Sequence, residues 1–166
     1  MTLTMYAGAG MWDKAKQVRE TMSALGIKKI PGIVNVTVKS FNETTPKARW
    51  VANNTDHKEY SLIEKTLMNM FALLKNNGYV VDRRWLLQES DNPDECFHSE
   101  MLAIAWALVN SPTHTAIFLS KNLRICGNCH EASKLVSVLY GRDIYARDAN
   151  RHHHFSDGKC SCGGYW

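Results

Sequence analysis

The sequence predicts one compact α/β domain in which helices pack on a layered sheet. Its 166 residues are enough to bury a hydrophobic core, with room for a short appendage. Hydrophobic residues make up 45% of the chain and charged residues 22%, as in ordinary globular proteins. In the C-terminal half, segments of strand and helix character alternate, and this order is typical of a sheet with helices packed on it.

In the N-terminal half, apolar residues recur at helical spacing in two segments and alternate in another. Gly26 and Gly78 follow the two helical segments as stop signals, and the pair Pro31-Gly32 breaks the chain. The expected elements are a helix over 11–25, a strand over 33–41, a loop or short hairpin over 42–56, a helix over 61–76 and a strand over 79–87.

In the C-terminal half, two helical segments alternate with short apolar strands. The expected elements are an acidic loop over 89–95, a helix from 98 to about 108, a strand over 115–119, a helix over 126–140 and a strand over 143–147. Pro112 closes the first of these helices. The tail over 150–166 is rich in His, Cys and Gly and shows no periodicity.

Charge and cysteine content narrow the class of protein. The net charge of +4 is compatible with a polyanionic partner. No apolar run is long enough to cross a membrane, so we expect no membrane partner. The first residues resemble neither a signal peptide nor a transit peptide, and we expect any targeting segment outside this chain. Five cysteines argue against a simple disulfide framework and favour metal ligation in a reducing compartment.

Two short motifs carry the chemistry. His98-Ser99-Glu100 opens one expected helix, and Cys126-Gly127-Asn128-Cys129 opens another. His-x-Glu followed by Cys-x-x-Cys is the signature of the zinc deaminases. Two cysteines in the first turn of a helix can face one ion, and the helix N-terminus favours their thiolates. With His98 as the third ligand, the fourth tetrahedral position is left to water, which is the catalytic arrangement of zinc.

Glu100 is expected to act as the proton shuttle. It lies two residues from His98, still in the first turn, and can reach the bound water and the substrate without being a ligand. The generic signature has proline before the first cysteine, where Ile125 stands here. A structural zinc site is the alternative, because Cys-x-x-Cys alone more often marks a zinc knuckle.

Downstream residues can supply a second zinc site. The donors are His130, the run His152-His153-His154, and Cys160-Ser161-Cys162. Four such ligands close the shell, so that this site would be structural and would hold the tail to the helix of Cys129. We expect the ligands to be His130, His154, Cys160 and Cys162, with His153 as the competitor for His154 because adjacent strand residues point opposite ways. The alternative is a solvated histidine run.

The remaining candidates are weaker. Cys96 is expected to be a buried thiol, and His57 and His114 to be surface residues. Basic side chains around the metal motifs could contact RNA phosphates or form a solvated face: Lys121, Arg124, Arg142, Arg147 and Arg151. Aromatic residues near the C-terminus could stack on bases or pack in the core: Phe155, Tyr165 and Trp166.

These motifs resemble the DYW domain, which ends many plant pentatricopeptide-repeat (PPR) RNA editing factors. The resemblance rests on HSE at 98–100, KNLRICGNCH at 121–130 and RHHHFSDGKCSCGGYW at 151–166. Pro31-Gly32 matches the "PG box" that opens the domain, and YAGAGMW at 6–12 is similar to the end of the preceding helical extension. The ending Gly164-Tyr165-Trp166 departs from Asp-Tyr-Trp.

The resemblance implies both architecture and activity. It implies a cytidine deaminase-like fold over 30–166, a possible gating insertion within 33–90, a zinc-bound tail over 150–166 and the end of an E-type extension over 1–29. It implies zinc-dependent deamination of cytidine to uridine in single-stranded organellar RNA, with two Zn²⁺ per chain. Upstream PPR repeats, and possible other editing factors, would be partners. The compartment would be the chloroplast or the mitochondrion, with the chloroplast slightly favoured.

Two other functions stay open from the sequence. A non-catalytic two-zinc module could bind RNA or recruit a separate deaminase. The same domain could instead cleave RNA.

Overall fold

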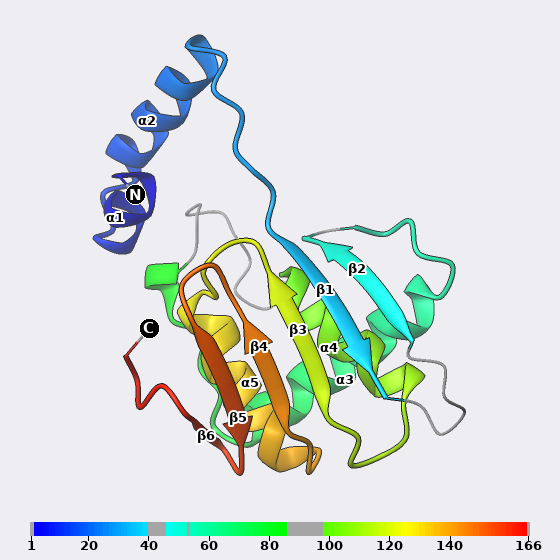
Figure 1. Ribbon diagram of the computed structural model, residues 1–166. Coiled ribbons are helices and arrows are strands. Elements are labelled where there is room, and N and C mark those ends of the chain that lie inside the picture. The colour runs from blue at the N-terminus through cyan, green and yellow to red at the C-terminus, as the bar shows by residue number, and fades with distance from the viewer. Residues whose placement is uncertain (1, 40–45, 53, 86–97, 166) are drawn as a thin grey trace. The chain divides into compact units, whose positions relative to one another are not determined.

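The computed structural model describes residues 2–39, 46–52, 54–85 and 98–165 (Figure 1). The loop expected over 89–95, Cys96 and Trp166 lie outside these residues. The chain divides into two compact units, 1–31 with 80–96 and 32–79 with 97–166. Within the described residues, no helix is both long and apolar enough to cross a membrane.

In the first unit, the described residues form two helices and a short 3₁₀ helix. Helix α1 spans Thr2–Gly8, α2 spans Trp12–Ala24 and η1 spans Arg83–Trp85. The strand expected over 79–87 is wrong for 80–85. Asp82 Oδ1 accepts a hydrogen bond from the backbone N–H of Arg84 at 3.0 Å, and the N–H of Trp85 donates to the Asp82 carbonyl. These local bonds tighten the chain into a turn and compete with sheet pairing.

The second unit is a six-stranded sheet with three helices. The strand order is β2-β1-β3-β4-β5-β6. The strands are β1 (Ile33–Val38), β2 (Lys47–Val51), β3 (Ile117–Lys121), β4 (Ile144–Arg147), β5 (His152–Ser156) and β6 (Lys159–Cys160). The helices are α3 (Tyr60–Asn76), α4 (Ser99–Asn110) and α5 (Gly127–Leu139). All three helices lie on the same side of the sheet (Figure 1).

Alternation along the strands directs one face of the sheet to the helices. On β1, Val34, Val36 and Val38 are buried, while Asn35 between them is exposed. Helix α4 lies against this face, and every residue from Ser99 to Ala107 is buried. A helix that is buried all round is mostly apolar, as this one is.

The parallel pair β3–β4 sets the position of the metal motifs. These strands pair from Ile117↔Ile144 to Ser120↔Arg147, so both end at the same edge of the sheet. Helix α5 follows β3 as a crossover and begins beyond that edge. Ligands at the start of α5 therefore lie at the carboxyl end of the parallel strands, where α/β sheets commonly place their sites.

The α/β prediction is confirmed, as are the helices expected over 11–25, 61–76, 98–108 and 126–140. The hairpin alternative for 42–56 is also supported, because β2 pairs antiparallel with β1. The tail over 150–166 differs from expectation, because it forms β5 and β6. Along β5 buried and more exposed side chains alternate, and the buried ones are His153 and Phe155. Because most residues of this strand are histidines, the alternation does not appear in the sequence as a pattern of apolar and polar residues.

Ile117 in β3 tests the core of this sheet. It is fully buried between the helices and the central strands. We expect Ile117→Ala to lower the free energy of unfolding by about 2–5 kcal/mol, because it leaves a cavity in a packed interior. Val138→Ala on the exposed surface of α5 is the control and should change it by less than about 0.5 kcal/mol. Denaturant titration of the zinc-loaded chain measures both, and equal losses would contradict the packing described.

Candidate metal centres

Three residues at the starts of two helices meet at the edge of the sheet and form the His98 cluster: His98, Cys126 and Cys129. His98 immediately precedes α4, Cys126 is the N-cap of α5, and Cys129 lies in its first turn. His98 Nδ1 is 3.2 Å from Cys126 Sγ and 3.3 Å from Cys129 Sγ. One ligand atom from each of the three lies within 4.8 Å of the others, which is the spacing that a shared metal ion needs.

The N-terminus of α5 explains why Cys126 points to this centre. Its sulfur accepts a hydrogen bond from the Cys129 backbone N–H at 3.4 Å, in the manner of an N-cap side chain. Hydrogen bonding from Cys129 and the neighbouring His98 hold the pKa of the Cys126 thiol well below its usual value, although burial acts in the opposite direction. The thiolate, which is the metal-binding form, is therefore favoured.

The donor set of the His98 cluster fits zinc. Two thiolates and one imidazole are ligands that Zn²⁺ takes in tetrahedral sites. Among the described residues, no fourth His, Cys, Asp or Glu brings a ligand atom within the same 4.8 Å spacing. Three protein ligands and one remaining position are the pattern of catalytic zinc sites.

Glu100 is buried beside the His98 cluster. Its side chain is 2% exposed and lies in the first turn of α4. Oε2 accepts a hydrogen bond from Ser99 Oγ at 3.1 Å, and Oε1 lies 2.5 Å from Lys121 Nζ at the end of β3. Its charge raises the pKa of Cys126, so the carboxylate is within electrostatic range of that thiol. The ion pair with Lys121 fixes the direction in which the carboxylate points.

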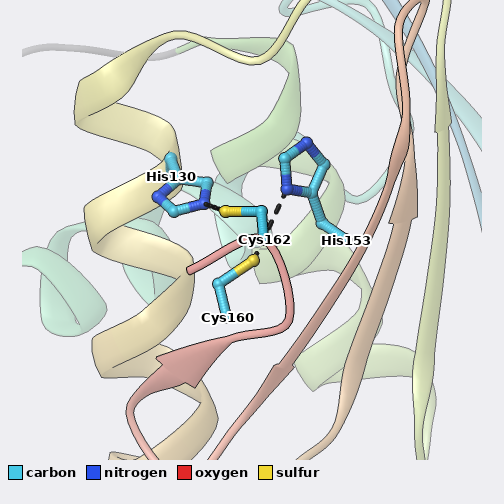
Figure 2. A group of neighbouring side chains, drawn as sticks. All are labelled: His130, His153, Cys160 and Cys162. Atoms are coloured by element: carbon cyan, nitrogen blue, oxygen red, sulfur yellow. Dashed lines mark hydrogen bonds between the residues drawn. The ribbon is translucent and has the colours of Figure 1, made fainter. Parts of the chain in front are cut away.

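The His130 cluster consists of His130, His153, Cys160 and Cys162 (Figure 2). Cys162 Sγ lies 3.3 Å from His130 Nε2, and Cys160 Sγ lies 3.5 Å from His153 Nδ1. One ligand atom from each of the four lies within 4.8 Å of the others. Two cysteines and two histidines are a common closed zinc shell, so this donor set also fits zinc.

His153, and not His154, belongs to this cluster. The sequence favoured His154 and kept His153 as the competitor. Because successive strand residues face opposite sides, His153 of β5 points to α5 and His154 to the other face. The His154 ring stacks on Tyr145 at a centroid distance of 4.3 Å. Phe155 was a signal for this choice in the sequence. An apolar residue of a strand faces the core, and His153, two residues before Phe155, faces the same side.

Burial changes the pKa values of both histidines of this cluster in the direction that favours metal binding. It lowers the pKa of the His130 imidazole and that of the His153 imidazole, so both favour the neutral form. Neutral imidazole is the form that binds a metal. Burial also raises the pKa of the Cys160 thiol. Because a ligating cysteine must lose its proton, metal binding at this cluster would release the proton of Cys160.

Asp148 connects the two clusters, and sequence analysis did not identify it. Oδ2 accepts a hydrogen bond from the backbone N–H of Ile125 at 3.0 Å and lies 3.5 Å from His153 Nε2. Burial alone would raise the pKa of Asp148, but hydrogen bonds from the N–H groups of Ile125, Asn150 and Arg151 lower it below its usual value. The carboxylate thus fixes the residue that precedes Cys126 and orients the His153 ring.

Two of the other candidates have structural roles. Arg142 is buried and donates to backbone carbonyls around the end of α4, including those of Ala107 and Pro112, so it is not placed to bind RNA. Phe155 is fully buried in the core. The exposed members of the basic set are Arg124, Arg147 and Arg151.

Comparisons with known proteins identify the family. A model of the DYW family of nucleic acid deaminases matches residues 78–166, which include both clusters. A pentatricopeptide repeat-containing protein of Arabidopsis thaliana is 39% identical over 166 residues, 98% of this chain and 20% of that protein. A mitochondrial one from the same plant is 38% identical over 166 residues (98% and 25%), and a chloroplastic one is 39% identical over 165 residues (98% and 20%). The chain therefore spans a fifth to a quarter of the length of these relatives.

Asp148→Asn tests the connection between the clusters. Removing the charge weakens the orientation of His153, and we expect zinc affinity to fall by about 10- to 100-fold, as for other residues that orient metal ligands. Asp143→Asn is the matched control, because Asp143 is half-exposed and its neighbour His154 is outside the cluster. Zinc transfer to a coloured chelator measures both. Equal retention of zinc by the two variants would contradict the role of Asp148.

Proposed function

Since the chain belongs to the DYW family of nucleic acid deaminases, we propose that it converts cytidine to uridine in single-stranded organellar RNA. The motif resemblance is confirmed by this match, and the α/β sheet with its helices is the fold expected from it. The observation that carries the proposal is the buried carboxylate of Glu100 beside a three-ligand cluster.

His98, Cys126 and Cys129 would hold the catalytic zinc. A bound zinc ion supplies a water molecule of lowered pKa at its remaining position. Glu100 would accept one proton from that water and deliver it to the ring nitrogen of cytidine while the remaining hydroxide bonds to C4. It would then pass the second proton of the former water to the amino group, so that the C4–N bond breaks and ammonia leaves. Lys121 would hold the Glu100 carboxylate in place for these transfers.

His130, His153, Cys160 and Cys162 would hold a second zinc ion with a structural role. The four donors come from α5, β5 and the chain that begins at β6. A closed shell leaves no position for a reacting water. Binding energy at this site would stabilise the C-terminal segment, where apart from Phe155 few side chains reach the core.

The relatives support a wider proposal about the whole protein. They are named pentatricopeptide repeat-containing proteins, and some are named chloroplastic and another mitochondrial. We propose that this chain likewise works in one of those organelles and is guided to its RNA site by upstream repeats. The boundary at 29/30 and the gating insertion within 33–90 stay predictions.

Glu100→Gln tests the catalytic proposal. The variant keeps the shape of the side chain but cannot accept a proton, so uridine formation should fall by about 10²–10⁴-fold. Glu64→Gln, an exposed carboxylate on α3, is the control and should react at the wild-type rate. The chain is joined to a repeat array that binds a chosen RNA, and nucleosides from the recovered RNA are quantified by mass spectrometry.

Other outcomes of this assay separate the alternatives. Uridine formation by Glu100→Gln at the wild-type rate would contradict the role of Glu100 and favour a binding or recruiting module. Shortened RNA without uridine would indicate a cleaving domain.

Zinc content tests the two sites independently of activity. The two donor sets predict about two zinc ions per wild-type chain and about one in either Cys129→Ser or Cys162→Ser. Cys96→Ser is the control, because the sequence assigns Cys96 to neither site, and it should keep both ions. Elemental analysis of the purified chains measures this. Loss of both ions, or of none, in each single variant would contradict separate sites.

A further inference from the structure

One face of the sheet points away from α3, α4 and α5 (Figure 1), and we call it the open face. The strand pairing places two rows of side chains on this face. Strand register defines each row, since paired residues lie side by side. The first row consists of Arg49, Asn35, Ser120, Arg147 and His152. The second row consists of Lys47, Thr37, Phe118, Tyr145 and His154.

The composition of these rows suits a polyanion that also carries flat rings. Lys47, Arg49 and Arg147 are cationic, and neither row contains Asp or Glu. Asp143 lies beside one end of the second row, 3.5 Å from His154 Nε2. Proteins that bind single-stranded nucleic acid combine basic side chains for the phosphates with aromatic side chains on which bases stack.

Three rings of the second row form a continuous stack across β3, β4 and β5. Phe118 and Tyr145 have centroids 5.2 Å apart and ring planes within 12°, and Tyr145 and His154 lie 4.3 Å apart and within 7°. The stack borders a hollow of about 250 Å³, which Arg147, His152 and Ser161 also line. This volume is below the roughly 300–1,000 Å³ of pockets for drug-sized ligands and suits one planar base.

The first row lies next to the candidate catalytic edge. Ser120 precedes Lys121, which pairs with Glu100. Arg147 precedes Asp148, which fixes Ile125, and His152 precedes His153 of the second cluster. A strand residue advances the chain by about 3.3 Å, so the open face begins within a short step of the edge where the target nucleotide would bind.

We propose that the open face binds the RNA chain beside the target nucleotide, with a base at the Phe118–Tyr145–His154 stack and phosphates at Arg49 and Arg147. The identity of the nucleic acid as single-stranded RNA rests on the proposed function. Charge complementarity favours this occupant, since the two rows carry cations and contain neither Asp nor Glu.

Variants of the open face test this proposal in the zinc-loaded full chain. The probe is a fluorescein-labelled oligouridylate of about 12 nucleotides, within the roughly 4–16 nucleotides that single-stranded binding modules cover. We expect Tyr145→Leu to weaken binding by about 5- to 150-fold, the range for one lost base stack, because it removes the middle ring that holds Phe118 and His154 parallel as the platform for the base. Tyr145→Phe keeps the ring and should bind as the wild type does. Fluorescence anisotropy measures both.

Charge reversal gives the second arm. Arg49→Glu should weaken binding and reduce the slope of log affinity against log salt by about 0.7 for each phosphate that the variant no longer neutralises. Lys65→Glu is the matched control, since it changes the same charge on the outer surface of α3. Equal effects of the two charge reversals would show that RNA responds to the net charge of the protein and not to a site on the open face, and this would overturn the proposal. Unchanged binding by Tyr145→Leu would also overturn it.

Hydroxyl-radical footprinting tests whether another part of the chain covers the open face in place of RNA, and it needs no variant. Tyr145 and His154 should react in the free chain and be protected by the probe. Rings already protected without RNA would show that another part of the chain covers the open face, and this would overturn the proposal. These measurements report binding alone and need no turnover, because the oligouridylate probe contains no cytidine. Failure of the deamination assay and failure of this inference are therefore distinguishable.

Discussion

The start of α5 contributes donor side chains to both the His98 cluster and the His130 cluster. Cys126 caps the helix and Cys129 lies one turn later, so both face His98. His130 is the next residue, and a step of one residue rotates its side chain by roughly a quarter turn toward β5 and β6. Any shift of this helix would move both clusters, so its position is the constraint on which the remaining geometry depends.

Two buried carboxylates hold that arrangement together. Asp148 binds the backbone at Ile125 and approaches His153, so the catalytic candidate and the structural candidate share one support. Glu100 pairs with Lys121 at the end of β3 and is thereby fixed at the same edge of the sheet. A carboxylate buried with its partner is costly to leave unpaired, which favours a single geometry. The described part of the C-terminal segment thus supports the candidate catalytic edge without supplying a residue to the His98 cluster.

Sequence patterns predicted those parts of the fold and site that depend on local spacing. The spacing His-x-Glu and Cys-x-x-Cys predicted that His98, Cys126 and Cys129 could share an ion, and the structure brings them together. The choice between His153 and His154 depended on strand parity, which the sequence shows only through Phe155. Asp148, Lys121 and the ring stack depend on strand register between distant segments. No local pattern encodes that register, so the contacts of Asp148, the pairing of Lys121 with Glu100 and the ring stack became visible only in the folded chain.

The central claim is that the start of α5 donates ligands to two zinc ions, one with three protein ligands and one with four. An X-ray crystal structure with anomalous differences measured at the zinc absorption edge tests it most directly. The account predicts two peaks, one with His98, Cys126 and Cys129 as its protein ligands and one with His130, His153, Cys160 and Cys162. A single peak would contradict the account. So would a fourth protein ligand at the first ion, or Glu100 separated from that ion by packed side chains.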